Sequence, residues 1–174
     1  RSTATVAQTL QLNGYSTGWF GKAHITPVWE TGPAGPFDRW PTGLGFDRFY
    51  GFLGGETSQY EPALYDQTTP IRPYLGREDY HLTEDLADKT IEWMRLQQTS
   101  APDKPFFVYF APGAGHCPHQ VWPEWSDRFA GQFDEGWDAL RQSTFERQLA
   151  DGMIPEGTTL TPRPPEIPAW DDYD

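Results

Sequence analysis

The clearest hydrophobic pattern in the chain is a run of large apolar residues at positions 106–110, Phe-Phe-Val-Tyr-Phe, bounded by prolines. An apolar run without alternation predicts a strand that is buried on both faces, which is typical of a parallel sheet with helices on either side. In such sheets, the loops at the carboxyl ends of the strands form the ligand crevice. The loop that follows this run holds two imidazoles, His116 and His119. We therefore expect this loop to face a ligand site.

Apolar side chains at helical spacing predict three helices, each with a capping residue or a glycine stop signal at one of its ends. The predicted helices span residues 5–13, 82–96 and 134–150. Thr83 and Asp134 are the expected N-caps of the second and third helices, because their side-chain oxygens can accept from the free N–H groups of the first turn.

Short β-type runs at 15–20 and 46–53 predict two further strands. A helix, a glycine, a strand and a polar loop in this order make half of a βαβ arrangement. Residues 25–45 are rich in Pro and Gly but also hold three large aromatic residues, which predicts an ordered loop packed by its own rings. The sequence thus predicts an α/β fold, a mostly parallel sheet flanked by helices with long ordered Pro/Gly-rich loops, and shows no internal repeat.

Composition excludes several classes of partner. The 174 residues include 13 basic and 25 acidic side chains, for a net charge of −12, which argues against nucleic acid as a ligand. Aromatic residues make up 16% of the chain, too many for a disordered acidic segment. No apolar run approaches membrane-spanning length, so we expect no membrane span. A single cysteine excludes an internal disulfide.

Lys22 and His24 are the first candidate site residues, because side chains two apart at the end of a strand point the same way. A cation and an imidazole that converge on one spot suit a tetrahedral oxyanion. The alternative is a surface lysine beside a histidine in a loop contact. Two strand ends that both carry such residues, the second being the loop with His116, favour the oxyanion site.

Other polar residues give weaker signals. Cys117 lies beside His116, but adjacent residues seldom reach the geometry of a nucleophile and its base, so a structural thiol is favoured. A zinc site made by His116, Cys117 and His119 lacks a fourth ligand at the usual spacing. His81, before the second helix, is interpreted as structural. Residues 56–58, Glu-Thr-Ser, follow a Gly-Gly turn and are candidates to line a crevice.

Residues 13–24, Asn-Gly-Tyr-Ser-Thr-Gly-Trp-Phe-Gly-Lys-Ala-His, resemble the second signature of the sulfatase family, which is Gly-Tyr-x-Thr, a short apolar run and then Gly-Lys-x-His. The stretch 105–119 looks like a later sulfatase block, an apolar strand that leads into a loop with an active-site histidine. Residues 29–52 and 161–171 are similar to the large bacterial arylsulfatases. The resemblance covers nearly the whole chain.

This resemblance implies a sulfuric ester hydrolase on the alkaline-phosphatase-like fold. It implies a formylglycine, made from a cysteine or serine in a Cys-x-Pro-x-Arg type motif, whose hydrated aldehyde attacks sulfur with the help of a calcium-type divalent cation. On the matching positions, Lys22 would neutralise charge on the sulfuryl oxygens, and His24 would hold the formylglycine hydroxyl or act as a base. His116 would protonate or polarise the leaving oxygen. The implied substrate is a small-molecule sulfate ester.

The departures from the family pattern define what this chain lacks. Cys117 is not the formylglycine position, because the proline is at the wrong offset and the arginine is missing. The nucleophile motif and the metal-binding Asp and Asn residues are also absent. Residues 1–174 are therefore expected to be a single segment of a sulfatase catalytic domain that lacks the N-terminal nucleophile region and the C-terminal part. The formylglycine and the ligands of the cation would lie outside this chain, and the segment alone would be inactive.

Two alternatives stay open. A Lys-His oxyanion clamp does not by itself separate sulfate from phosphate, so the parent protein is alternatively a phosphatase or phosphonate monoester hydrolase of the same superfamily. The third hypothesis is a non-catalytic oxyanion-binding remnant. The oligomeric state is open, and so is the location of the parent protein, for which a soluble form in the bacterial periplasm or cytoplasm is expected.

Overall fold

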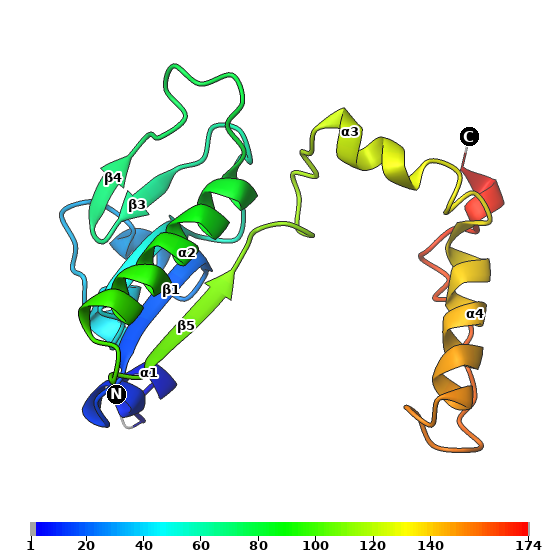
Figure 1. Cartoon of the computed structure of the whole chain (residues 1–174). Coiled ribbons are helices and arrows are strands. Elements are labelled where there is room, and N and C mark those ends of the chain that lie inside the picture. The colour runs from blue at the N-terminus through cyan, green and yellow to red at the C-terminus, as the bar shows by residue number, and fades with distance from the viewer. Residues whose placement is uncertain (1–2, 174) are drawn as a thin grey trace. The chain divides into compact units, whose positions relative to one another are not determined.

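The structure of the protein is a computed structural model that describes residues 3–173 (Figure 1). The chain divides into two compact units, one that ends at Val121 and one that begins at Trp122. Each unit is described by itself. None of the described helices is both long and apolar enough to cross a membrane.

The first unit is built on a five-stranded sheet. Its strands are β1 (Ser16–Ala23), β2 (Arg48–Leu53), β3 (Leu64–Asp66), β4 (Thr69–Ile71) and β5 (Phe106–Ala111). They lie in the order β4-β3-β2-β1-β5, and β1 pairs in parallel with both β2 and β5. The short strands β3 and β4 add an antiparallel edge. Because the three parallel strands are neighbours, the loops that follow them leave the sheet at one edge.

Two helices pack against opposite faces of this sheet, α1 (Val6–Leu12) and α2 (Leu82–Ser100), and Figure 1 shows α2 lying over the strands. Successive side chains of a strand point to opposite faces, so Trp19 packs in the core under α1 and Phe20 in the core under α2. Each aromatic side chain buried in this way contributes about 1.5–3 kcal/mol to stability. The fold is therefore α/β, as the sequence predicts.

The helix α1 begins and ends close to where the sequence predicts. Thr5 is its N-cap, with its hydroxyl accepting from the Gln8 N–H at 3.1 Å while the Gln8 side chain accepts from the Thr5 N–H at 3.0 Å. The apolar residues Val6 and Leu12, at the two ends of this helix, are 61% and 86% exposed. Ala7 faces the sheet instead, fully buried, since a small side chain lets this short helix approach closely.

The N-cap of α2 is His81, which corrects the predicted cap at Thr83. The His81 Nδ1 accepts from the Thr83 N–H at 3.3 Å. The other ring nitrogen, Nε2, lies 3.1 Å from the carbonyl oxygen of Gln120 and can donate to it. His81 thus has the structural role expected of it. It joins the start of α2 to the end of the loop at 112–120, which carries His116 and His119 and is called the histidine loop below.

The strand β5 is less buried than predicted. It lies at the edge of the sheet and pairs only with β1 among the described strands, and Tyr109 and Phe110 are 45% and 42% exposed. The expectation of burial on both faces is therefore wrong for residues 3–173. An apolar run indicates that a strand is shielded from water, but it does not indicate which segments of the polypeptide pack against its two faces.

The Pro/Gly-rich stretch between β1 and β2 is ordered by its rings, as predicted. It contains the 3-10 helices η1 (Val28–Glu30) and η2 (Pro41–Leu44). The fully buried Trp40 packs edge-on against Phe37 and Tyr65, with ring centroids 5.1 and 5.0 Å away. Its indole N–H donates to the carbonyl oxygen of Glu30 at 2.7 Å.

The second unit contains the short helices α3 (Pro123–Ser126) and η3 (Asp127–Phe129), the longer α4 (Gly136–Ala150) and the 3-10 turn η4 (Trp170–Asp172). The predicted cap at Asp134 is wrong, because α4 follows Glu135 and has no side-chain cap. Gly136 begins the helix because the Trp170 ring occupies the space of its missing Cβ, which would lie 2.1 Å from the ring.

Candidate active site at the carboxyl ends of three parallel strands

The predicted site residues lie at the end of β1 and on the segments that leave the sheet after β1, β2 and β5. Lys22 is the penultimate residue of β1, in register with Phe52 of β2. His24 follows β1, Glu56 follows β2, and His116 follows β5. Because these three strands are parallel neighbours, their carboxyl ends place these four residues at one edge of the sheet.

His24 lies against the segment that follows β2. A Cβ atom at Gly55 would lie only 3.2 Å from the His24 Cε1, so the glycine leaves room for the ring. The strand β1 ends at Ala23, so His24 lies one residue beyond it in an exposed turn. In the sequence, the Gly-Gly turn at 54–55 is the signal for this contact.

Glu56 joins the histidine loop to residues 54–59, the loop that follows β2 and is called the β2 loop below. The Cys117 Sγ donates to the Glu56 Oε2 at 2.7 Å, and the His116 Nδ1 lies 3.7 Å from the same oxygen. The His116 Nδ1 is also 2.9 Å from the Cys117 carbonyl oxygen and 3.4 Å from the Cys117 Sγ. These contacts place His116, Cys117 and Glu56 in one exposed cluster.

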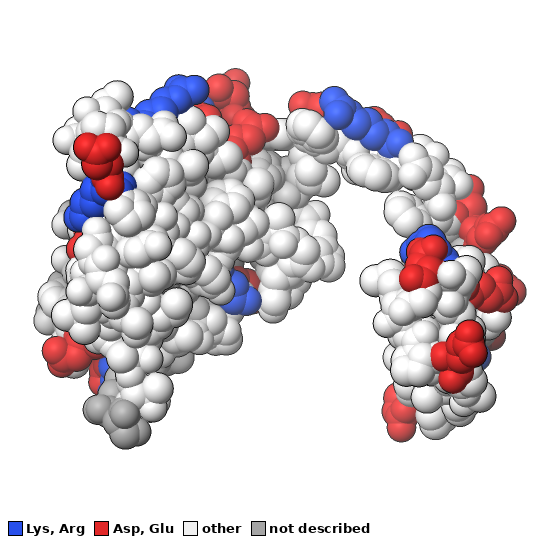
Figure 2. Space-filling model, turned by 60° about the horizontal axis from the view of Figure 1, so that its bottom comes forward, with Lys and Arg blue, Asp and Glu red and all other residues white. Residues whose placement is uncertain are grey.

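The electrostatics of this cluster connect it to β1. The hydrogen bond to Glu56 is the main cause that raises the pKa of the Cys117 thiol above its usual value, and the positive charge of Lys22 opposes that rise. Figure 2 shows Lys and Arg side chains scattered singly among acidic ones on the face that it presents.

A second set of hydrogen bonds, made by Gln120, joins the same two loops, and the sequence did not predict it. The Gln120 Oε1 accepts from the Gln59 N–H at 2.8 Å and from the Ser58 hydroxyl at 3.3 Å. Nothing in the sequence marks Gln120, because its partners lie 61 and 62 positions away. Together with the contact between His81 and the Gln120 carbonyl oxygen, these hydrogen bonds hold the end of the loop that carries His116 and His119.

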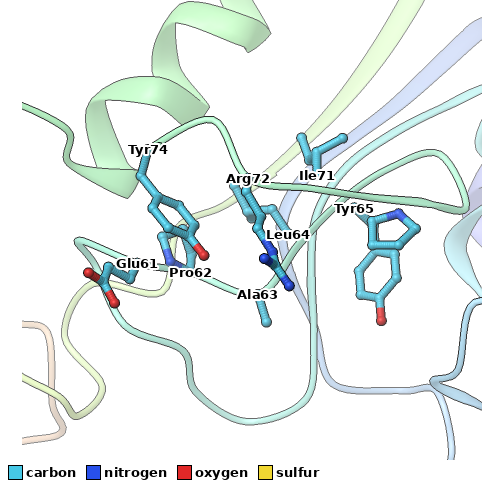
Figure 3. A pocket seen from close by; sticks show the side chains of 9 residues that line it. Glu61, Pro62, Ala63, Leu64, Tyr65, Ile71, Arg72 and Tyr74 are labelled. Atoms are coloured by element: carbon cyan, nitrogen blue, oxygen red, sulfur yellow. The ribbon is translucent and has the colours of Figure 1, made fainter. Parts of the chain in front are cut away.

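A cavity of about 270 Å³ lies beside the antiparallel edge of the sheet, between the segment before β3 and the segment after β4 (Figure 3). Glu61, Arg72 and Tyr74 are among the residues that line it. Its two charged side chains have opposite signs, so they do not favour an anion. We do not assign the predicted oxyanion site to this cavity.

The implied calcium-type cation does not fit the donors that this part of the chain offers. Within residues 3–173, the one group of His, Cys, Asp or Glu side chains with donor atoms within 4.8 Å of one another consists of Glu56, His116 and Cys117. Calcium takes oxygen ligands, and this group supplies one nitrogen and one sulfur. No step below is therefore assigned to a cation held by these residues.

Comparisons with known proteins support the resemblance seen in the motifs. The family model described as Sulfatase matches residues 1–163, so the chain belongs to the sulfatase family. It is 29% identical over 165 residues to an arylsulfatase of Klebsiella aerogenes, an alignment that covers 90% of this chain and 33% of the relative. It is 28% identical over 175 residues to an uncharacterized sulfatase of Schizosaccharomyces pombe, covering 91% and 29%. The chain thus spans about a third of the length of these relatives.

Solved structures share the fold of this chain. The crystal structure of Ps i-CgsB matches with a TM-score of 0.57 and 22% identity over 71% of this chain and 29% of that protein. Its complex with k-i-k-neocarrahexaose matches with a TM-score of 0.51 and 27% identity, at the same coverage. BT4656, in complex with its substrate D-glucosamine-2-N,6-O-disulfate, matches with a TM-score of 0.53 and 22% identity, over 76% and 23%. These matches confirm the alkaline-phosphatase-like α/β fold.

Proposed function

We propose that this chain is the sulfate-holding segment of an arylsulfatase-type sulfuric ester hydrolase, and that catalysis belongs to the complete polypeptide. One observation carries the proposal. The Gly-Lys-x-His segment forms the end of β1 and the residue after it, and the histidine loop follows β5, which pairs in parallel with β1 up to Gly21 and Ala111. Membership in the sulfatase family supports the same chemistry.

In this proposal, the first task of the chain is to hold the tetrahedral anion. Lys22 stabilises negative charge on the sulfuryl oxygens through its ammonium group, and this charge grows in the transition state. Lys22 is suited to the role because it extends from a regular strand, which limits its freedom of position. His24 donates to the group that attacks sulfur, or takes the proton when the sulfate ester of the enzyme breaks down.

The second task is to protonate the leaving oxygen as the bond between it and sulfur breaks. We assign this proton to His116, the residue that matches the family position. The Cys117 carbonyl oxygen accepts from Nδ1 at 2.9 Å, which leaves Nε2 to carry the transferred proton. The Glu56 carboxylate, 3.7 Å from Nδ1, is an ion-pair partner for the protonated ring.

The remaining parts of the reaction lie outside this sequence in the proposal. The family resemblance supplies a formylglycine as the nucleophile and a divalent cation of the calcium type, and both belong to other parts of the complete polypeptide. The isolated segment is therefore expected to be inactive. The proposed substrate is a small-molecule sulfate ester, supported by the arylsulfatase relative.

The test is the turnover of an aryl sulfate by the complete polypeptide and its variants. Lys22→Ala and His116→Ala should each lower kcat/KM by about two orders of magnitude or more, because each removes an interaction with developing charge. Lys104→Ala is the matched control for the lysine, since Lys104 is exposed and lies before β5, at the opposite end of the strand. Wild-type rates for Lys22→Ala and His116→Ala would remove both residues from the mechanism.

His119→Ala should be measured beside His116→Ala, because both imidazoles leave β5 on one loop. A large loss in His119→Ala together with a wild-type rate in His116→Ala would move the proton donor to His119. Comparing an aryl sulfate with an aryl phosphate separates a sulfatase from a phosphatase of the same superfamily. No turnover of either ester by the complete polypeptide would favour a non-catalytic oxyanion-binding protein.

A further inference from the structure

Three side chains with different metal-binding atoms meet where the β2 and β5 loops touch. Glu56 offers a carboxylate oxygen, His116 an imidazole nitrogen and Cys117 a sulfur. Glu56 and Cys117 are 61 positions apart in the sequence, so the fold creates this group. Spacing along the chain cannot predict it, because only His116 and Cys117 are neighbours.

The distances between the donor atoms suit one small ion. The Cys117 Sγ lies 2.7 Å from the Glu56 Oε2 and 3.4 Å from the His116 Nδ1, and that nitrogen lies 3.7 Å from the same Glu56 oxygen. A tetrahedral zinc ion holds neighbouring donors of these kinds about 3.3–3.6 Å apart. Only the sulfur and the carboxylate oxygen must separate, by about 1 Å.

The donor set determines which metal the group would select. Nitrogen, sulfur and carboxylate oxygen are the ligands of zinc, whereas calcium and magnesium take oxygen. All three residues are exposed, so an ion can enter from solvent, and the fourth position is left to water or an anion. Binding releases to the solvent the thiol proton, which now points at Glu56. The proton that His116 Nδ1 donates to the Cys117 carbonyl oxygen also leaves, and the neutral zinc-bound ring carries its proton on Nε2.

We propose that Glu56, His116 and Cys117 form a zinc site. This site is distinct from the cation implied by the family resemblance, because its ligands and its preferred metal differ. The consequence for catalysis rests on the proposed function. If His116 gives a proton to the leaving oxygen, a zinc ion bound to its Nδ1 fixes the ring in the metal site, so zinc reversibly inhibits turnover.

The binding test uses cobalt as a spectroscopic probe for zinc on the complete, calcium-loaded polypeptide kept in its reduced form. The wild type should show a thiolate-to-cobalt charge-transfer band that one equivalent of zinc removes. Cys117→Ala should lack this band, which also separates Cys117 from any other thiol of the polypeptide. Glu56→Gln should weaken binding by at least about tenfold, since even an outer partner of a ligand has that effect. Glu61→Gln, an exposed glutamate on the same segment, is the matched control and should bind as the wild type does.

Zinc inhibition of turnover is measured on the same variants as the ratio of rates with and without zinc. Zinc should lower the wild-type rate at least tenfold at saturation, while Cys117→Ala should be at least tenfold less sensitive. A cobalt spectrum that is the same in wild type and Cys117→Ala would overturn the zinc site and leave the proposed function untouched. Zinc binding without inhibition would confirm the site and contradict the role proposed for His116. Melting curves check that Cys117→Ala and Glu56→Gln fold. If Cys117→Ala does not fold, the weaker metal binding expected of Glu56→Gln still tests the site.

Discussion

Replacing Gly21 by alanine should destabilise the sheet at the point where the candidate site begins. Gly21 has a φ of 115°, a backbone conformation that residues other than glycine rarely adopt. It lies in the middle strand of the parallel sheet, in register with Gly51 on one side and Ala111 on the other. A Cβ atom at this position would lie 2.0 Å from the Ala111 carbonyl oxygen and 2.6 Å from its carbonyl carbon. Both are backbone atoms, so a side-chain rotation cannot relieve the overlap.

The size of the effect is the sum of two costs. The unfavourable φ costs about 1–2 kcal/mol for a residue with a Cβ. Forcing one additional methyl group into a filled space costs a further 1–3 kcal/mol or so, by comparison with overpacked cores. We therefore expect Gly21→Ala to lose about 2–5 kcal/mol of the free energy of unfolding.

Gly14→Ala isolates the first cost. Gly14 follows α1 with a φ of 86°, and no atom lies within 4 Å of the position of its Cβ. Both variants place a Cβ at a positive φ and stiffen the unfolded chain, so their difference of about 1–3 kcal/mol reports mainly the overlap.

The assay is urea unfolding of the complete polypeptide and both variants, followed by tryptophan fluorescence, with turnover measured beside it. Gly21→Ala should unfold at a lower urea concentration than Gly14→Ala. It should also lower turnover, because Lys22 follows Gly21 directly in β1. Equal losses of stability in the two variants would refute the close approach of β1 and β5.

Two further predictions concern buried polar groups of the first unit. The fully buried Thr17 hydroxyl donates to a backbone carbonyl at 2.7 Å and accepts from the Asp47 N–H at 3.0 Å, so Thr17→Val should cost about 1–3 kcal/mol in urea unfolding. Thr17→Ser keeps the hydroxyl, and a valine variant as stable as the serine one would contradict this. Burial, and then hydrogen bonds to Asp85 at 2.6 and 2.8 Å, raise the pKa values of Tyr50 and Tyr80 well above the usual range. The unfolded chain loses these two phenol protons near pH 10 and the folded chain keeps them, so stability should fall as the pH rises above about 10. A spectrophotometric titration should leave these two phenols protonated until unfolding, and their ionisation in the folded protein near pH 10 would disprove the buried pair.

The candidate site was predictable where its residues are close in sequence. Lys22 and His24 belong to one motif at the end of one strand, and that motif resembles a sulfatase signature. The pairing of Glu56 with Cys117, and of Gln120 with Ser58 and Gln59, was not predictable. These contacts join loops that are more than 60 positions apart, and the polar residues involved carry no periodic signal.

The local elements follow from the sequence itself, because helical spacing, caps and apolar runs act over a few residues. These features predicted α1, α2, α4 and the three parallel strands, within a few residues at their ends. Tertiary structure alone decided which face of α1 is buried, where β5 lies in the sheet and which side chains meet at the strand ends. Burial and charge pairing depend on what each surface packs against, and that partner comes from a distant part of the chain.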